Sequence, residues 1–593
     1  MEKIEWTDEQ LDAIDTRDKT LLISAAAGSG KTATLTERII RSILDADNPI
    51  SIKDMLIVTF TNAAVDQLRD KISEAIRRAA AESPDSSKLE EELLTVKDAK
   101  IMTIDAFCNS ILRISADSVG LPPNYRIGDE AELSILKSAV MEGLIEACYE
   151  GELPEICSAK EFARLAECLT TARGEGGLAE VFISLYEETE SAKEGLDTLR
   201  PLIDMYRPED FVSVDSTRFG EEIRKRVDAA MSSYKSSYGM LRYMENGNPK
   251  DMKAYPKLLT ELSEIEAILA ADSYAERREL IQGFTQASMR GLRGDSSEYY
   301  TRIMAVRKML KADIDSFREK FYSYTENEWR ALYEELYAKL SILFRFLKKF
   351  DSLFRREKLT RGVCSYGDIE RYAYSALWQG GERTDLAKEL AASFSAVYID
   401  EYQDVNSLQN AIFEAVSSPT NRFMVGDIKQ SIYGFRSAKP EIFAEMKRRF
   451  PKFSRELDSD EAGIFMSRNF RCDREIIDFT NGIFDKMFGV LGKSIEYDTD
   501  DRLIFSKKYK EGEHPRGNIP EIHVMEKLTD SGDYSGSDED IIDEATEAEA
   551  EAIEIAAAAV AGKVDELIHG GIKADGKLYT ATGIPYRRLR GCS

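Results

Sequence analysis

Two patterns of apolar positions alternate near the start of the chain: a short continuous run, then a run at helical spacing. The apolar stretch 20–24 leads into a glycine-rich turn, and apolar side chains return at helical spacing over 35–44. The stretch 55–60 is followed in the same way by a helix face over 64–76. Further short strands are predicted at 101–104, 396–399 and 422–425. Repeated strand–helix units predict an α/β fold with a parallel sheet, whose strands end at a shared ligand crevice.

The region between the third and fourth predicted strands is nearly three hundred residues long and has helical periodicity. It is too long for a loop, so we predict an inserted helical domain. The expected organisation is a first α/β domain at 1–116 and 385–452, a helical insertion at 117–384, and the beginning of a second α/β domain at 453–593.

The predicted second α/β domain begins with strands at 464–466 and 522–525. Residues 529–562 contain no Lys or Arg, and their pattern changes from loop-like to helix-like near Asp543. We expect a solvated acidic loop that leads into a surface helix.

Composition places the chain among soluble globular proteins, with 43% hydrophobic and 32% charged residues in 593. No apolar run is long enough for a membrane span, and the start of the chain is acidic and polar where a secretory signal would be basic and then apolar. We therefore expect a cytoplasmic protein. The seven cysteines form no CxxC pair and only three histidines occur, which argues against a disulfide framework, a zinc site or histidine-based catalysis.

The net charge of −27 argues against a nucleic-acid partner, because phosphate binding normally requires a basic surface. A global sum does not describe local fields, however, and a groove that stacks bases on aromatic rings needs few cations. One local basic stretch comprises Arg345, Lys348, Lys349, Arg355, Arg356, Lys358 and Arg361. The alternative for this stretch is a solvated helix face.

The segment AAAGSGKT fits the phosphate-loop pattern GxxxxGK[ST], with alanine in place of the first glycine. Its position between a predicted strand and an amphipathic helix favours a phosphate site over a chance match. Backbone amides can form an anion nest at the start of the helix. Lys31 can reach the β and γ phosphates of ATP, and Thr32 can bind Mg²⁺. The predicted ATP site comprises Ala25, Ala26, Ala27, Gly28, Ser29, Gly30, Lys31 and Thr32.

Two acidic residues, Asp400 and Glu401, follow the predicted strand 396–399. Two carboxylates at the end of a buried strand are costly unless they have a function. Asp400 can hold Mg²⁺, and Glu401 can accept a proton from the water that attacks the γ phosphate. The alternative, an Asp-Glu pair that starts a surface turn, loses weight beside a phosphate loop.

The segment FMVGDIKQSIYGFRSAKPEIF starts as another strand and ends in amide, aromatic and cationic groups. We predict that Gln430 senses the γ phosphate or the attacking water. The alternation of Tyr433, Phe435 and Arg436 suits a surface that stacks bases and contacts a phosphate, although such aromatic residues more often belong to a core. The same edge of the crevice is expected to hold Phe60, Thr61, Asn62 and Thr103.

The segment SRNFRC is a weaker signal. Phe470 could stack on adenine, and Arg471 could act on the γ phosphate as an arginine finger.

In this order, the motifs resemble those of superfamily one DNA helicases of the UvrD/RecB type, and within them the family of AddA subunits of bacterial AddAB helicase-nucleases. WTDEQLDAI resembles the family's adenine-reading motif, with Gln10 as the glutamine. The motor motifs that follow are AAAGSGKT, TFTNAAVDQLRDKI, TIDAFC, IDEYQD, FMVGDIKQSIYGFRSAKPEIF and RNFRC. Two departures are Asp105, where many relatives carry histidine, and Cys472, where serine is usual.

The resemblance implies a RecA-like motor domain, with a large helical insertion and the start of a second RecA-like domain. It also implies ATP and Mg²⁺ as cofactors, and 3′ to 5′ movement on single-stranded DNA from double-stranded ends. The expected role is double-strand break repair as a heterodimer with an AddB-like subunit.

The family's later motor motifs and its nuclease domain have no counterpart in the chain, and the final residues IPYRRLRGCS do not form the apolar strand that the family places there. We therefore expect a fragment or a frameshifted reading, without nuclease activity. An ATP- and DNA-binding module without sustained turnover is the main alternative, and a phosphate-loop ATPase that acts on proteins is a third.

Overall fold

The computed structural model describes residues 5–45, 47–82, 87–122, 124–170, 177–434, 437–488, 497–507, 572–574 and 577–579. The chain divides into two compact units, which are described separately. The first comprises Met1–Ser134, Glu190–Lys193 and Arg356–Ser593, and the second comprises Ile135–Thr189 and Glu194–Arg355. The predicted strand at 522–525 and the acidic segment 529–562 lie outside the described residues.

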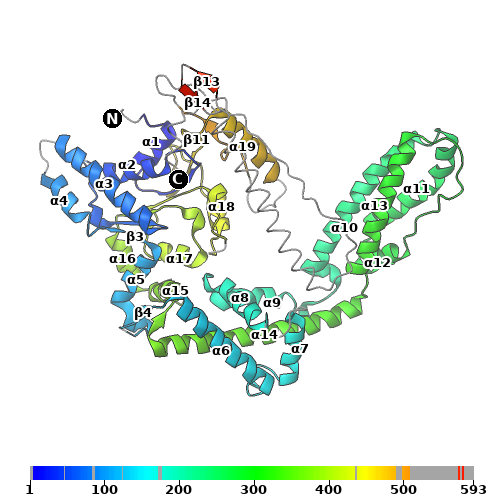
Figure 1. Ribbon diagram of the computed structural model, residues 1–593, viewed down its shortest axis with the longest axis horizontal. Helices are drawn as coiled ribbons and strands as arrows, with labels where there is room; N and C mark the ends of the chain where they lie inside the picture. Colours follow the sequence, from blue (N-terminus) through cyan, green and yellow to red (C-terminus); the bar gives the residue numbers. More distant parts are fainter. Residues whose placement is uncertain are drawn as a thin grey trace. The chain divides into compact units, whose positions relative to one another are not determined.

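The first unit is built on a six-stranded parallel sheet (Figure 1). Its order is β10 (Glu461–Met466), β1 (Thr20–Ala25), β9 (Arg422–Gly426), β8 (Ala396–Ile399), β2 (Met55–Thr59) and β3 (Lys100–Thr103). Every residue of β1, β2 and β8 is buried, which is typical of parallel strands with both faces covered. The predicted α/β fold with a parallel sheet is confirmed.

The strand β10 corrects the expected organisation. It pairs with β1 in parallel, from Thr20 opposite Glu461 to Ala25 opposite Met466. The expectation that residues from 453 onward start a second α/β domain therefore fails for this strand, which forms the edge of the first sheet. An apolar strand such as GIFM can pair with either sheet, and covering the buried strand β1 satisfies its backbone groups.

Helices cover both faces of the sheet because successive side chains of each strand point to opposite sides. Leu21 and Ile23 lie in one apolar core, whereas Leu22 lies in the other. The first core is completed by α1 (Asp8–Asp15), α2 (Lys31–Ile43), α3 (Asn62–Glu82) and α4 (Ser87–Thr95). The second is completed by α5 (Ile104–Ser115), α15 (Tyr366–Leu377), α17 (Ser407–Ala415) and α18 (Pro440–Arg449).

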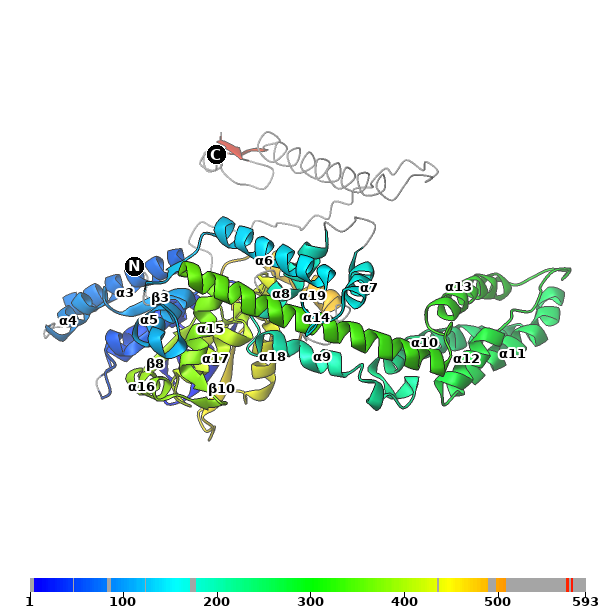
Figure 2. The same ribbon diagram turned by 90° about the horizontal axis from the view of Figure 1, so that it is seen from below.

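The second unit is helical and contains two apolar clusters. One joins α10 (Arg218–Tyr238), α11 (Pro249–Ala270), α12 (Tyr274–Gly283) and α13 (Glu298–Lys320), which lie side by side in both views (Figure 1 and Figure 2). The other joins parts of α6 (Glu130–Glu150), α7 (Ala159–Leu169), α8 (Leu178–Glu190) and α14 (Glu326–Arg361).

The bounds of the helical unit are narrower than the predicted insertion at 117–384. The reason is that α15 packs into the core beneath the sheet, and β4 (Arg126–Ile127) pairs with β5 (Val363–Cys364) within the first unit. Among the described residues, none of the helices has both the length and the apolar character that crossing a bilayer requires.

Candidate active site at the carboxyl edge of the sheet

The loop between β1 and α2 has the backbone geometry of a phosphate cradle. Gly28 and Gly30 adopt positive φ values of 71° and 88°, in the left-handed region that glycine enters without strain. The Ser29 amide donates to the Ala26 carbonyl at 3.0 Å, which closes the turn. The helix α2 begins directly at Lys31, so the N–H groups of its first turn have no partner within the helix. Such a helix start attracts anions.

Three predicted catalytic side chains meet above this loop. The Lys31 amine donates to Glu401 Oε2 at 2.9 Å and to Gln430 Oε1 at 3.5 Å. Glu401 follows β8 and Gln430 follows β9, so three strand ends supply the three groups. Glu401 is one of the few non-glycine residues with positive φ, at 51°, which places its carboxylate against the lysine.

Asp400 lies beside this group, at the end of β8. Its backbone amide donates to the Val58 carbonyl at 3.0 Å, and its Oδ1 accepts from the Glu401 amide at 3.0 Å. Burial, reinforced by the charge of Glu401, raises the pKa of Asp400 to about 6. Asp400 and Thr32 line the same cleft of about 400 Å³. A hydroxyl and a carboxylate at a cleft are oxygen donors of the kind that Mg²⁺ prefers, so the residues fit that ion.

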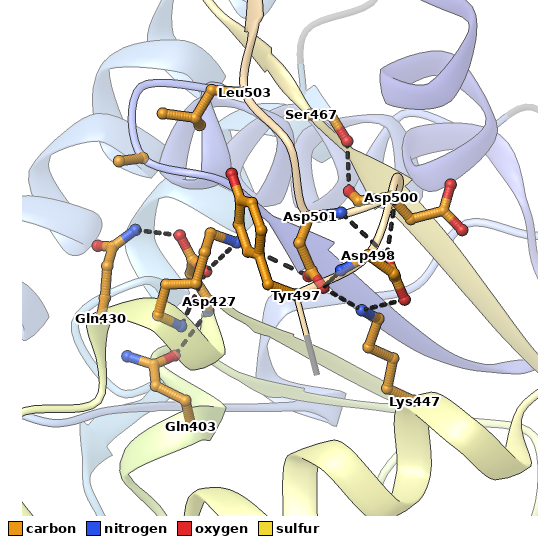
Figure 3. A network of polar contacts seen from close by, with 12 residues as sticks. Gln403, Asp427, Gln430, Lys447, Ser467, Tyr497, Asp498, Asp500, Asp501 and Leu503 are labelled. Atoms are coloured by element: carbon orange, nitrogen blue, oxygen red, sulfur yellow. Dashed lines mark hydrogen bonds and ion pairs between the residues drawn. The ribbon is translucent and has the colours of Figure 1, made fainter. Parts of the chain in front are cut away.

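Two residues that the sequence analysis did not single out hold Gln430 and Glu401 in place. The Gln430 amide donates to Asp427 Oδ2 at 2.7 Å (Figure 3). The Asp427 backbone amide donates to Gln403 Oε1 at 2.9 Å, and Gln403 in turn donates to Glu401 Oε2 at 3.0 Å. Together with Lys31 these contacts close a ring around the cleft. Asp427 carries the same sequence signal as Asp400, a carboxylate directly after a buried strand.

The segment after β10 closes over the other side of the loop. The Phe470 amide donates to the Gly28 carbonyl at 2.9 Å. Asn469, which is buried, donates to the Ala27 carbonyl at 2.7 Å and accepts from the amides of Arg471 and Cys472, each at 2.8 Å. Asn469 is a further functional residue that the motif reading missed. Arg471 lines a second cleft, of about 500 Å³, with Gly28, Lys31, Glu401 and Gln430.

Gln10 contacts the phosphate loop directly. Its Nε2 donates to the Ser29 carbonyl at 2.9 Å, and its Oε1 accepts from the Thr7 amide at 2.9 Å as part of a capping box. The side chain is buried, so its amide is fixed against Ser29. Each amide group retains one further hydrogen-bonding position, which is what contact with adenine needs. Its adenine-reading role stays a prediction.

The predicted DNA contacts fall into three groups. The rings of Phe60 and Tyr433 stack on each other, with centroids 4.9 Å apart, and both line the cleft that contains Asp400. Thr61 lines that cleft too, and Asn62 is exposed at the start of α3. Thr103 instead caps α5, because its side-chain oxygen accepts from the Ala106 amide. The last two predicted contacts, Phe435 and Arg436, lie outside the described residues.

Comparison with known proteins agrees with this arrangement. Residues 6–451 match the family model described as UvrD/REP helicase N-terminal domain. A relative from Clostridium novyi (strain NT) is 29% identical over 99% of this chain and 47% of its own length. Relatives from Anoxybacillus flavithermus and Lachnoclostridium phytofermentans are 31% and 32% identical, over 87% and 88% of this chain and 43% and 38% of their own lengths.

Each of these three relatives is named as one subunit of an ATP-dependent helicase/nuclease, the AddA-type component, and the chain spans less than half the length of each. The resemblance to UvrD-type helicases and to AddA proteins is confirmed. With the family model matched over most of its length, the chain belongs to the UvrD/REP helicase family.

Proposed function

We propose that the chain binds ATP at the loop 25–32 and uses its hydrolysis to move 3′ to 5′ along single-stranded DNA. The observation that supports this most directly is the meeting of Lys31, Glu401 and Gln430 above the loop. We place the activity in double-strand break repair in the cytoplasm, with double-stranded DNA ends as the starting point. The relatives are named as one subunit of a larger enzyme, which supports a second protein as partner, and we propose that this partner is AddB-like.

The chain's own residues divide the work of hydrolysis. Lys31 contacts the β and γ phosphates, and Thr32 with Asp400 holds Mg²⁺. When bound, the ion supplies positive charge that offsets the negative charge of the transferred phosphoryl group. Glu401 accepts the proton of the attacking water, and Gln430 orients that water. Arg471 completes the set as a cation directed at the γ phosphate.

The ion pair between Lys31 and Glu401 gives the mechanism a resting position. Glu401 Oε2 is 2.9 Å from the lysine amine, so each group neutralises the other. A terminal phosphate offers Lys31 a more highly charged partner than one carboxylate does. Its arrival draws the lysine away, and Glu401 becomes free to accept a proton.

The stacked pair Phe60 and Tyr433 supports a DNA contact in the same cleft. Aromatic rings bind unpaired bases by stacking, with little sequence preference, at about 1–3 kcal/mol per base. These rings line the cleft that also contains Asp400 and Glu401. We propose that a base entering beside them separates the two rings and shifts the strand ends that carry the catalytic groups.

The test compares two cleft variants with two surface controls. Lys31→Ala removes the phosphate contact and is expected to abolish binding of a fluorescent ATP analogue. Glu401→Gln keeps the shape but removes the proton acceptor, so binding is retained while turnover stimulated by single-stranded DNA falls by about 10²-fold or more. Lys225→Ala and Glu221→Gln, at an exposed ion pair on α10, are the matched controls.

Turnover that survives both cleft substitutions would overturn the proposal. ATP binding without DNA-stimulated turnover in the parent chain would instead favour a nucleotide- and DNA-binding module. Failure to bind an oligonucleotide at low salt would favour an ATPase that acts on proteins.

A further inference from the structure

A buried series of alternating carboxylates and amines leads from Gln430 to a segment about seventy residues further along the chain (Figure 3). Asp427 accepts from Gln430 at 2.7 Å and pairs with the Lys429 amine at 2.7 Å. That amine lies 3.8 Å from Asp501 Oδ1, and Asp501 Oδ2 pairs with Lys447 at 2.7 Å. The side chains of Asp427, Lys429 and Asp501 are 1%, 6% and 1% exposed, so solvent screens them little.

Asp427 is shared between the catalytic cleft and this buried series. Its Oδ2 accepts the Gln430 amide, whereas its Oδ1 accepts both the side-chain amine and the backbone amide of Lys429. The position of the lysine charge therefore affects how strongly Asp427 holds Gln430. Because Gln430 Oε1 is the atom nearest to Lys31, a change at Asp427 reaches the phosphate loop in two contacts.

Asp501 acts on Lys429 from the opposite side. Its Oδ1 is buried and accepts no hydrogen bond within the described part of the chain, although the Lys429 amine is 3.8 Å away. An unpartnered carboxylate oxygen is costly unless a nearby charge compensates for its lost hydration. It attracts Lys429 without capturing it. The amine therefore lies between two carboxylates, bonded to Asp427 and drawn toward Asp501.

Lys447 on α18 holds Asp501 in this position. Its amine pairs with Asp501 at 2.7 Å and with Asp498 at 3.1 Å. Burial alone would lower the pKa of Lys447, but the hydrogen bonds and charges of Asp501 and Asp498 raise it, so the amine stays charged.

We propose that Asp501 is a positioning residue for Gln430, acting through Lys429 and Asp427. By holding the lysine charge, it leaves Asp427 Oδ2 available to fix the Gln430 amide toward the γ phosphate. The inference rests on the proposed function and adds to it a residue that no helicase motif identified above includes. It predicts that the sensing of the third phosphate, rather than nucleotide binding in general, depends on the charge of Asp501.

Other contacts anchor the segment around Asp501 independently of its charge. Asn481 accepts from the Tyr497 hydroxyl at 2.7 Å and from the Leu503 amide at 3.0 Å. The Ser467 hydroxyl donates to the Asp500 carbonyl at 2.6 Å. An asparagine at position 501 still offers an oxygen to Lys447 and to the Asp498 amide, which donates to Asp501 Oδ2 at 3.2 Å. Asp501→Asn is therefore expected to keep the fold.

The experiment measures the affinity of the 593-residue chain for ADP and for a non-hydrolysable ATP analogue. Asp501→Asn is expected to lower the preference for the ATP analogue over ADP by about tenfold, as loss of one charge-assisted contact would, and to leave ADP affinity unchanged. The matched control is Asp500→Asn, which removes an exposed pair with Lys452 on the same segment and is expected to change neither affinity. Thermal unfolding checks that both variants fold.

Combination with Gln430→Ala separates positioning from a structural role. If Asp501 acts through Gln430, Asp501→Asn has no further effect on the preference once Gln430 is removed. Equal effects in both backgrounds, or a normal preference in Asp501→Asn beside a reduced one in Gln430→Ala, would overturn the inference. A parent chain that binds neither nucleotide would instead overturn the proposed function. If Asp501→Asn does not fold, Lys429→Met is measured in its place, against the same expectation.

Discussion

Glu370 is a buried carboxylate close to the sheet but outside the proposed catalytic cleft. It is 7% exposed on α15 and accepts from Gln409 at 2.7 Å. Burial, reinforced by the charge of Asp105 and only partly offset by the Gln409 hydrogen bond, raises the pKa of Glu370 to about 7. Its ordinary value is 4.5, so the folded protein binds more protons than the unfolded chain between these two values. The free energy of unfolding therefore falls as pH rises through that window.

Glu370→Gln removes this penalty. At pH 8 the variant is expected to be more stable than the parent, by as much as about 3 kcal/mol, and the difference should vanish near pH 4.5. Urea unfolding at both pH values measures it, with the exposed Glu91→Gln as a control that stays within about 0.5 kcal/mol of the parent at each pH. A variant less stable than the parent at pH 8 would show that the ionised carboxylate is stabilised in the folded protein.

The sequence predicted which residues meet at the cleft better than how they are held. Lys31, Glu401 and Gln430 could be brought together in advance because the carboxyl ends of parallel strands share one edge. The contacts of Gln403 and Asn469 could not, because each joins segments whose spacing depends on the folded backbone. Thr103 shows the converse, since a threonine at a strand end also suits a helix cap.

At the scale of elements, β10 and the turn after it hold the phosphate loop from the side opposite Lys31. Asn469 makes three hydrogen bonds there, to Ala27, Arg471 and Cys472. Asn469→Ala is expected to lower the stability of the first unit by about 1–3 kcal/mol, because it leaves buried groups unpaired. Affinity for ATP should fall by about tenfold, because the loop loses its fixed shape.

The matched control for Asn469 is Asn421, whose side chain also joins two segments of the first unit. It donates to the Phe394 carbonyl at 2.8 Å and accepts from the Ser418 amide at 2.9 Å, and it lines neither cleft. Asn421→Ala should lower stability but leave ATP affinity unchanged in a titration with a fluorescent analogue. Equal affinity losses in both variants would mean that global stability, rather than the loop, sets ATP binding.

The placement of β10 also shows where prediction of elements stops. The strand itself could be predicted from the apolar run at 464–466. Its partner could not, because Glu461 pairs with Thr20 across more than four hundred residues, and a parallel strand carries no local signal for its neighbour.

At the scale of the whole molecule, the two compact units have separate cores. The helical character of the second unit could be predicted from periodicity, but its bounds could not. The helix α15 has the same amphipathic pattern as the helices of the insertion, although it packs beneath the sheet. The division into units depends on which apolar faces meet, and an amphipathic pattern does not specify its partner.

The helical unit contains a buried ion pair whose removal tests the independence of the two units. The Arg307 guanidinium donates to Glu261 at 2.8 Å, and Glu261 also accepts from the Tyr238 hydroxyl at 2.8 Å and from the Ala287 amide at 2.9 Å. Glu261 is 1% exposed, so its charge depends on these partners. Arg307→Met leaves a buried carboxylate without its cation, and we expect a loss of about 3–5 kcal/mol in the helical unit.

Because Arg307 lies in a core that the sheet does not share, we expect calorimetry of Arg307→Met to show one unfolding transition at lower temperature and the other unchanged. ATP affinity should stay at the parent value. The control Arg226→Met removes an exposed pair with Glu222 on α10 and should shift neither transition, since such pairs contribute about 0.3–0.5 kcal/mol. If both transitions of Arg307→Met move together, the units unfold as one cooperative body, and the separate cores do not make them energetically independent.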